Sequence, residues 1–396
     1  MTKRKVALDA RRAVRHITGI GHYIIELAKR IPTLAPDLEF QLLVDRPLPQ
    51  GALPAGCTQV VLGRFDADSA RCVRLYSPLW LNTYVPRYLR QNGVALFHGT
   101  NSVIPLWPPC KVVCSVHDVS FIELPSAYGP VYRRYMQTQV RLALRRADVV
   151  VTGSHSARKD VTELLPFCDG KVVVIHHGVG DEFREGYEDG YLRSVRSQFM
   201  LPDRYILHVG IVEVKKGIDT LLRAGANVIE AGFADAVVLA GCDGFGAREI
   251  RNLATGLGLG EKARFLGFVP QESLPGLYGQ ASVVAFSSQY EGFGLPVLEA
   301  MACGVPVIAS ESSSIPEVAG DAAVLVPPGD ARRLTVALKD VLGNAELRAE
   351  LRRRGLSRAR QFTWAESAAR HVAVYRQVLE KVDESSPRSE AGADRV

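Results

Sequence analysis

Short apolar runs alternate with helix-length amphipathic segments along this 396-residue chain, and this alternation limits its fold more than any other feature. The first three runs are residues 6–10, 39–44 and 94–98. Apolar strands separated by helices are typical of parallel sheets that are covered by helices on both faces. The sequence therefore predicts an α/β fold. Its length favours two domains, because a single core rarely grows beyond about 250–300 residues.

The composition is that of an ordinary soluble protein, with 47% apolar and 23% charged residues. No apolar run approaches the roughly 20 residues that cross a membrane. The first residues, Met-Thr-Lys-Arg-Lys, lead directly into a strand without an apolar signal core or a cleavage site. We therefore expect a cytoplasmic protein.

Positive charge is concentrated in the first half of the chain. Residues 1–180 hold 23 Lys and Arg against 13 Asp and Glu, whereas the remainder holds 25 against 29. No basic run interleaved with aromatic residues is present, so a nucleic-acid partner is not expected. The excess fits an anionic membrane or a pyrophosphate-bearing acceptor, and a plain solvated surface fits it equally. Peripheral contact of the first domain with the inner face of the membrane is therefore one of two alternatives.

The segment from Ser288 to Ile308 carries the clearest chemical signal. It follows a predicted buried strand, passes a glycine pair, and enters a helix whose first residue is predicted to be Pro296. The free N–H groups at such a helix start bind phosphate-type anions. A carboxylate repels phosphate, so Glu291 and Glu299 are predicted to accept hydrogen bonds from sugar hydroxyls instead.

This segment resembles the donor-sugar motif of the group 1 (family 4) retaining glycosyltransferases. The similarity lies in Glu-x7-Glu, in the inner Gly-Phe-Gly-Leu-Pro, and in Glu-Ala-Met-Ala-Cys-Gly-Val-Pro-Val-Ile. It implies the GT-B fold, in which two Rossmann-like domains face each other across a cleft. The expected domains are 1–185 and 190–364, and a helix at about 365–382 is expected to cross back to the first domain. The polar composition of 384–396 predicts a disordered tail.

The resemblance also implies the roles of the motif residues. Glu299 would bond the ribose hydroxyls of the donor, and Glu291 would bond hydroxyls of the transferred sugar. The remaining donor-binding residues of this loop and helix start are Gly292, Phe293, Gly294, Leu295, Pro296 and Val297.

A second anion site is predicted where a strand leads through paired lysines into a helix, and Gly210 at the end of that strand is a candidate donor-binding residue. The stretch from Gly210 to Lys216 resembles the Gly-Thr-Leu-Glu-Pro-Arg-Lys of related mannosyl- and rhamnosyl-type transferases. In the family an Arg and a Lys of this loop contact the diphosphate, and Lys216 takes the place of that lysine. Lys215 replaces the arginine, which keeps the charge and loses the planar fork, so it is only a candidate substitute.

Two polar residues, His117 and Asp118, end a predicted strand of the first domain, where open α/β sheets bind ligands. In the family this histidine reaches the transferred sugar, and Asp118 is a candidate acceptor contact. A histidine that only bonds a backbone carbonyl is the alternative. His98 ends a strand in the same way but matches the family less well.

Four further candidates come from backbone geometry. Gly19 and Gly21 lie at a strand-to-helix turn that borders the donor and acceptor sites in the family. Backbone groups near Gly267 and Phe268 lie where family members bond the nucleobase.

The resemblance implies transfer of a hexose from a nucleotide diphospho-sugar to an acceptor hydroxyl, with retention at the anomeric carbon. Lys216, Glu291 and His117 are the expected catalytic residues. No cofactor or metal ion is expected, since no Asp-x-Asp motif occurs in a suitable loop. His176 and His177 are not expected to share an ion, because neighbouring strand side chains point to opposite faces. The subgroup favours GDP-mannose and a glycan or lipid-linked glycan acceptor in bacterial surface polysaccharide or lipopolysaccharide assembly.

Three other functions are alternatives to this one. A sugar phosphorylase or synthase of the same fold would differ only in its soluble acceptor. A dinucleotide-dependent oxidoreductase would suit the sheets, but the first strand lacks the Gly-x-Gly-x-x-Gly signature and its acidic partner. A non-catalytic binding protein is disfavoured because both glutamates, His117 and Lys216 occur together.

Overall fold

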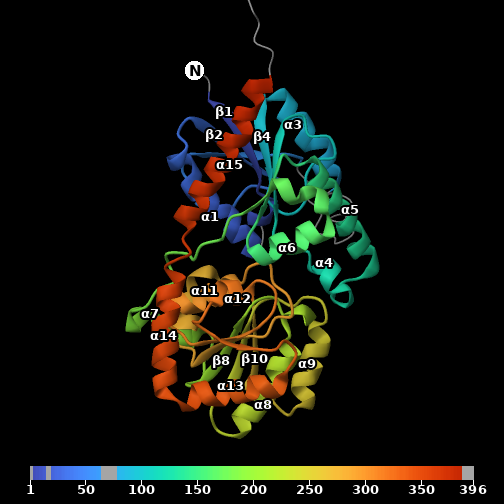
Figure 1. The fold of residues 1–396 in the computed structure, drawn as a ribbon. Helices are drawn as coiled ribbons and strands as arrows, with labels where there is room; N and C mark the ends of the chain where they lie inside the picture. The colour runs from blue at the N-terminus through green and yellow to red at the C-terminus, as the bar shows by residue number, and fades with distance from the viewer. Residues whose placement is uncertain (1–2, 15–18, 64–77, 386–396) are drawn as a thin grey trace, which may run out of the picture.

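Each half of the chain forms a parallel sheet in a lobe of its own (Figure 1). The computed structural model describes residues 3–14, 19–63 and 78–385. The first sheet runs in the order β3 (Cys57–Val61), β2 (Leu38–Val44), β1 (Arg4–Asp9), β4 (Val94–Gly99), β5 (Lys111–Val116), β6 (Val149–Thr152) and β7 (Val172–Val174). The second runs in the order β10 (Ala263–Gly267), β9 (Ala236–Ala240), β8 (Tyr205–Val209), β11 (Val283–Phe286), β12 (Val307–Ser310) and β13 (Val324–Val326).

Helices cover both faces of the first sheet, which buries most side chains of its central Val- and Leu-rich strands, whereas the edge strand β3 is only partly buried. One face packs against α1 (Gly19–Leu34), whose Tyr23, Ile24 and Leu27 are buried as its apolar spacing predicts. The other face packs against α3 (Val85–Gln91), α4 (Ser120–Glu123), α5 (Pro130–Arg146) and α6 (His155–Leu164).

The second sheet is covered in the same way. One face packs against α8 (Ile218–Glu230), α9 (Ala247–Gly256), α13 (Ala331–Gly343) and α14 (Ala345–Ala359). The other face packs against α7 (Asp189–Gln198), α10 (Leu274–Gly279), α11 (Leu295–Ala302) and α12 (Ile315–Ala319). Two doubly covered parallel sheets confirm the predicted fold class.

The last helix, α15 (Trp364–Ser385), leaves the second lobe and packs along α1 of the first (Figure 1). A buried polar network fixes it there. His371 Nε2 lies 2.8 Å from the hydroxyl of Tyr23, and the hydroxyl of Tyr375 lies 2.7 Å from Nδ1 of His98. His98 is therefore a structural residue of the first lobe, and the predicted crossing helix is confirmed.

Several boundaries differ from the sequence prediction. Helix α15 begins at Trp364 and continues to Ser385, while residues 386–396 of the predicted tail lie outside the described part. Helix α7 begins at Asp189, at the expected boundary between the two domains, and its Val195 packs into the second core. The edge strand β3 lies between the predicted runs 39–44 and 94–98 and was not predicted, because its side chains are mostly half-buried and do not form an apolar run.

The carboxyl ends of both sheets meet where the lobes touch. The segment after β5 contacts the segments after β8 and β11, through ion pairs and close backbone packing described below. Because all strands of a parallel sheet end at one edge, this junction collects the loops that carry the predicted site.

Candidate active site

The predicted anion-binding helix start is present in α11, one residue earlier than expected. The helix begins at Leu295, so Pro296 is its second residue. Gly294 precedes it with φ 106°, a left-handed conformation that favours glycine. The sequence prediction assumed that proline takes the first helical position, but a proline in the first turn removes no helical hydrogen bond at either place.

Lys216 and Glu291 form an ion pair in the centre of the site. Lys216 Nζ donates to Oε1 of Glu291 at 2.5 Å, and both side chains are more than four-fifths buried. The two loops that carry them are joined by backbone contacts, since Gln289 N–H donates to the carbonyl of Lys215 at 2.8 Å. An ammonium group and a carboxylate are thus held together beside the start of α11.

The backbone on both sides of this pair is tightly packed. Gly217 has φ 60°, and a Cβ atom added to it would lie 2.1 Å from the carbonyl oxygen of Ser287. The N–H of Glu291 donates to Oγ of Ser313 at 2.7 Å, and Oγ of Ser314 donates to the Glu291 carbonyl at 2.9 Å. These serines were not predicted as part of the site, although their run before a helix start was visible in the sequence.

Lys215 connects the two lobes. Its Nζ lies 3.6 Å from Oδ2 of Asp118 in the first lobe and 3.7 Å from Oε1 of Glu213 in its own. Burial lowers the pKa of Lys215, but Asp118 and the nearby glutamates outweigh it, so the pKa lies above its ordinary value. The ammonium group is therefore charged, and it is partnered by carboxylates in this structure.

His117 contacts the backbone of both lobes. Its Nε2 donates to the carbonyl of Thr100 at 2.7 Å, as the alternative interpretation of this histidine predicts. Burial lowers the pKa of His117 and outweighs the opposing influence of that carbonyl and of Asp118. The ring is therefore neutral at pH 7, and its Nδ1 is an acceptor that the Thr100 bond does not use.

The backbone at Gly292 packs tightly against the backbone of His117. A Cβ atom added to Gly292 would lie 1.7 Å from the carbonyl oxygen of His117. On the same side, Oγ of Ser154 donates to the carbonyl of Gly292 at 2.8 Å. The structure therefore brings His117 and Asp118 of the first lobe together with Lys216 and Glu291 of the second.

Glu299 lies apart from this group, in the second turn of α11. Its Oε2 accepts a hydrogen bond from the hydroxyl of Tyr278 at 2.8 Å, a partner that the sequence did not indicate. Burial raises the pKa of Glu299 to about 7, and the charge of Glu182 adds to the shift while Tyr278 opposes it. The carboxyl group is thus poised to change its charge near neutral pH.

The glycine candidates differ in their surroundings. Gly19 lies in the first turn of α1, and a Cβ atom there would be 3.7 Å from Leu295 Cδ1, so it faces the start of α11. Gly21, in the same turn, is buried. In the second lobe, Gly210 N–H donates to Ala240 O. The carbonyl of Gly267 accepts from Gly241 N–H at 2.8 Å, which leaves it one lone pair. Phe268, next to it, is 47% exposed.

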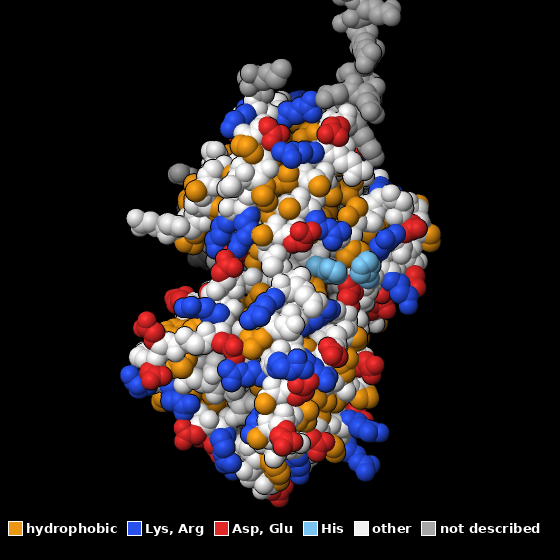
Figure 2. Space-filling view, turned by 60° about the vertical axis from the view of Figure 1, so that its left-hand side comes forward, with side chains coloured by type: hydrophobic (Ala, Val, Ile, Leu, Met, Phe, Trp, Pro, Cys, Tyr) orange, Lys and Arg blue, Asp and Glu red, His pale blue; other side chains and the backbone are white. Residues whose placement is uncertain are grey.

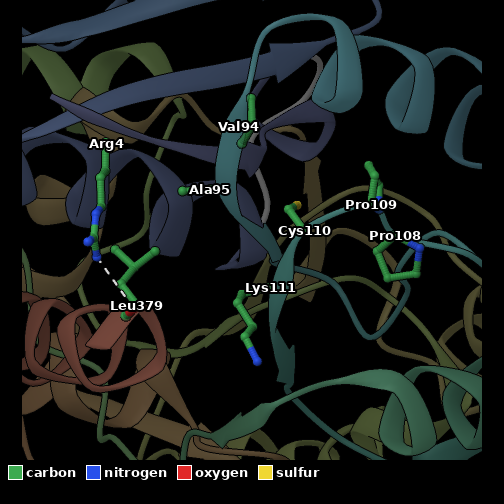
Figure 3. A pocket seen from close by; sticks show the side chains of 8 residues that line it. All are labelled: Arg4, Val94, Ala95, Pro108, Pro109, Cys110, Lys111 and Leu379. Carbon is green, nitrogen blue, oxygen red and sulfur yellow. Dashed lines mark hydrogen bonds between the residues drawn. The ribbon is translucent and has the colours of Figure 1, made fainter. Parts of the chain in front are cut away.

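A surface pocket of about 540 Å³ lies at the opposite edge of the first sheet (Figure 3). It is formed by the amino ends of β1, β4 and β5 and by the end of α15, whose Leu379 carbonyl accepts from Arg4 at 3.4 Å. Its residues are Arg4, Val94, Ala95, Pro108, Pro109, Cys110, Lys111 and Leu379. None of the predicted site residues lines it, so the lobe junction is the better candidate site.

Two families match the chain in succession. Residues 17–183 match "Glycosyltransferase Family 4", and residues 195–358 match "Glycosyl transferases group 1". The chain belongs to the group 1, family 4 glycosyltransferases. This glycosyltransferase is 28% identical over 373 residues to the O-antigen chain mannosyltransferase B of Escherichia coli, and the match covers 91% of this chain and 96% of that protein.

Solved structures share the fold of this glycosyltransferase. Sucrose-phosphate synthase of Thermosynechococcus elongatus superimposes with a TM-score of 0.78 at 22% identity, over 96% of this chain and 100% of that chain. The Anabaena protein HepE in complex with UDP-glucose gives a TM-score of 0.71 at 18% identity, over 96% and 99% of the two chains. Both likenesses support the predicted GT-B architecture. Among the helices of the described residues, none is long and apolar enough to span a membrane.

Proposed function

We propose that this glycosyltransferase moves a hexose, with mannose favoured, from a nucleotide diphospho-sugar to a hydroxyl of a glycan or lipid-linked glycan, with retention at the anomeric carbon. The observation that carries the proposal is the convergence of Lys216, Glu291 and the start of α11 on His117 across the lobe junction. A cation, a helix start and sugar-bonding groups in one place match a ligand that has both a pyrophosphate and a sugar.

The pyrophosphate of the donor would take Lys216 from its present partner. Phosphate oxygens carry more negative charge than one carboxylate, and the amide groups at the start of α11 add a second attraction. Released from Lys216, Glu291 would accept hydrogen bonds from hydroxyls of the transferred sugar. The ion pair thus holds both groups in the place where the donor would bind.

The transfer would proceed on one face of the sugar. The bond from C1 to the β-phosphate oxygen breaks, the bond from C1 to the acceptor oxygen forms on the same face, and the acceptor proton goes to the departing phosphate. Lys216 and the helix start stabilise the charge that grows on this phosphate. Neutral His117 would accept a hydrogen bond from the sugar through Nδ1, which fixes the position of the ring.

Lys215 and Asp118 would act at the edge of this site. Lys215 is paired with Asp118, which partly offsets its charge, and its direct contact with the pyrophosphate of the donor is part of the proposal. Asp118 would face the acceptor side from the first lobe. The positive charges of Lys215 and Lys216, together with the start of α11, would take the place of a metal ion. Turnover is therefore proposed to need no metal.

The choice of GDP-mannose rests on similarity. The full-length relative from Escherichia coli is a mannosyltransferase that acts on the O-antigen chain, and the loop from Gly210 to Lys216 has the short form of mannosyl-type enzymes. The solved neighbour with UDP-glucose supports a nucleotide-sugar donor in the same fold. A bacterial surface polysaccharide is the corresponding class of acceptor.

The basic surface of the first lobe supports a place for this reaction at an anionic membrane. Helix α5 exposes Val131 and Tyr132 beside its arginines, and the exposed fraction of Val131 is 83%. Arginines next to exposed apolar groups are the combination that binds anionic lipid surfaces. We propose peripheral contact through α5 on the cytoplasmic side, which co-sedimentation with anionic and neutral vesicles would test.

A panel of nucleoside diphosphates tests the donor. GDP is expected to raise the melting temperature more than UDP, ADP or dTDP, because a ligand of the native state stabilises it in proportion to its affinity. GDP-mannose with a lipid-linked glycan should then yield an α-linked product in the presence of a chelator. A larger rise in melting temperature with another nucleotide would show that the donor carries that nucleotide instead of GDP. Loss of turnover with the chelator that Mn²⁺ restores would contradict the metal-free mechanism. A sugar phosphate formed from inorganic phosphate would favour the phosphorylase alternative.

The raised pKa of Glu299 predicts a proton release when the nucleotide binds. Because the carboxyl group is half protonated near pH 7 and ribose hydroxyls favour its charged form, binding should expel the proton. Nucleotide affinity is therefore expected to rise between pH 6 and 8. Calorimetry in two buffers of different ionisation enthalpy measures the release, and Glu299→Gln should abolish the part that belongs to this residue. An unchanged release in that variant would refute the assignment.

A further inference from the structure

We infer that His155, His176 and Glu317 form a binding site for a divalent transition-metal ion, with zinc as the best match, that joins the two lobes outside the donor site. Within residues 3–14, 19–63 and 78–385, these three side chains place their ligand atoms within 4.8 Å of one another. Two imidazoles and one carboxylate are a ligand set that zinc takes in proteins, with water in the fourth position.

The three ligands come from three distant segments. His155 is the first residue of α6, His176 follows β7, and Glu317 lies in the first turn of α12 in the other lobe. His176 Nε2 lies 2.7 Å from Oε1 of Glu317, and the His155 and His176 rings have centroids 5.8 Å apart. Zinc lies about 2.0–2.2 Å from its nitrogen and oxygen ligands. Small movements of these three side chains would therefore bring their ligand atoms to these distances from one ion.

Neighbouring groups orient the ligands. Oε1 and Oε2 of Glu317 accept from the backbone N–H groups of His155 and Ser156 at 3.0 and 3.2 Å. The ring of His176 is packed beside Phe362 and Phe293, with centroid distances of 5.5 and 6.1 Å. Such contacts to the groups around a metal hold its ligands in position.

The site is open to solvent on one side. His155 is exposed, whereas His176 and Glu317 are partly buried, and Figure 2 shows histidine side chains on the surface where the two lobes meet. A metal ion could therefore reach the three ligands from solvent.

A hydrogen-bonded pair of His176 and Glu317 would connect the lobes without a metal. Such a pair would be complete without His155. The presence of the His155 imidazole beside the pair is therefore the observation that favours a metal site with three ligands. The adjacent pair His176 and His177 does not share this role, since the ring of His177 lies against Trp364 and Phe293 instead.

Zinc and cobalt titrations of the full chain test the site. We expect one Zn²⁺ per chain to raise the melting temperature, and Co²⁺ to give the visible absorption of a tetrahedral nitrogen and oxygen site that excess Zn²⁺ removes. His155→Ala should weaken Zn²⁺ binding at least about 100-fold, because a direct ligand contributes no less than the supporting groups around it. The backbone N–H of residue 155 and the His176–Glu317 bond remain in this variant, so it should fold normally.

Two further variants complete the test. His22→Ala removes an imidazole of the same lobe outside the group and should bind Zn²⁺ as the wild type does. Glu317→Gln should lose binding as His155→Ala does. Equal Zn²⁺ binding by the wild type and His155→Ala, or no metal-dependent shift at all, would overturn the inference. The GDP-induced shift of His155→Ala should stay unchanged, which separates this outcome from failure of the proposed transferase function.

Discussion

Replacement of Lys216 by methionine is expected to lower kcat by about 100- to 1000-fold, the usual effect of removing one group that stabilises developing charge. Methionine keeps most of the length of the side chain and removes the ammonium group that would face the leaving phosphate. The effect should fall on kcat and kcat/KM together, because the interaction strengthens as the C1–O bond breaks. Steady-state kinetics with GDP-mannose at saturating acceptor measures it.

The variant Lys216→Met also leaves Glu291 without its partner, so a control must separate this loss of stability from the loss of catalysis. Without Lys216 its carboxylate loses the 2.5 Å partner in a mostly buried position, which destabilises the protein as well. The double variant Lys216→Met with Glu291→Gln removes both charges and should recover melting temperature without activity. Lys159→Met changes an exposed lysine that pairs only weakly with Glu163 and should behave as the wild type. A folded Lys216→Met enzyme with normal kcat would contradict the proposed mechanism.

Replacement of Gly292 by alanine is expected to lower kcat/KM by about 100-fold, as displacements near 1 Å in an active site commonly do. The added methyl group would lie 1.7 Å from the His117 carbonyl oxygen, so the glycine loop and the strand end must separate. Overpacking of this kind also costs about 1–3 kcal/mol of the free energy of unfolding. Kinetics and chemical denaturation together measure both effects.

Gly190→Ala is the matched control, because no atom lies within 4 Å of the position of its added Cβ. Gly190 lies in α7, where alanine should be neutral or stabilise the helix by about 0.5–1 kcal/mol. If Gly292→Ala retained wild-type activity and stability, the loop would have to be free of the contact with His117 in solution.

The sequence was sufficient for the architecture and for the position of the donor loop. Apolar strands that end in Gly210, in His117 and just before Ser287 must bring their loops to the same edges of two parallel sheets. The turn before α11 could also be predicted, because glycine and proline determine local backbone geometry. The prediction placed the first residue of α11 at Pro296, one position later than Leu295, because a proline fits either of the first two helical positions.

Side-chain pairing could not be predicted, since it depends on how the loops pack against each other. The ion pair of Lys216 with Glu291 joins residues 75 apart, and that of Lys215 with Asp118 joins different lobes. The hydrogen bond from Tyr278 to Glu299 could not be predicted, because nothing in the sequence distinguishes this tyrosine from an ordinary core residue of a short helix. For His117 the resemblance and the residue chemistry gave two roles; the structure contains the bond to the Thr100 carbonyl, and the contact with the sugar stays a prediction.

The return of α15 to the first lobe has a consequence for synthesis on the ribosome. Strand β7 completes the first sheet at Val174, but Trp364, Tyr375 and the other residues that cover its apolar face are translated about 190 residues later. At about 5–20 residues per second, this nascent sheet waits for roughly 10–40 s with the face beside α1 uncovered. We therefore expect the first lobe to reach its native state only after α15 has emerged, and to depend on chaperones until then.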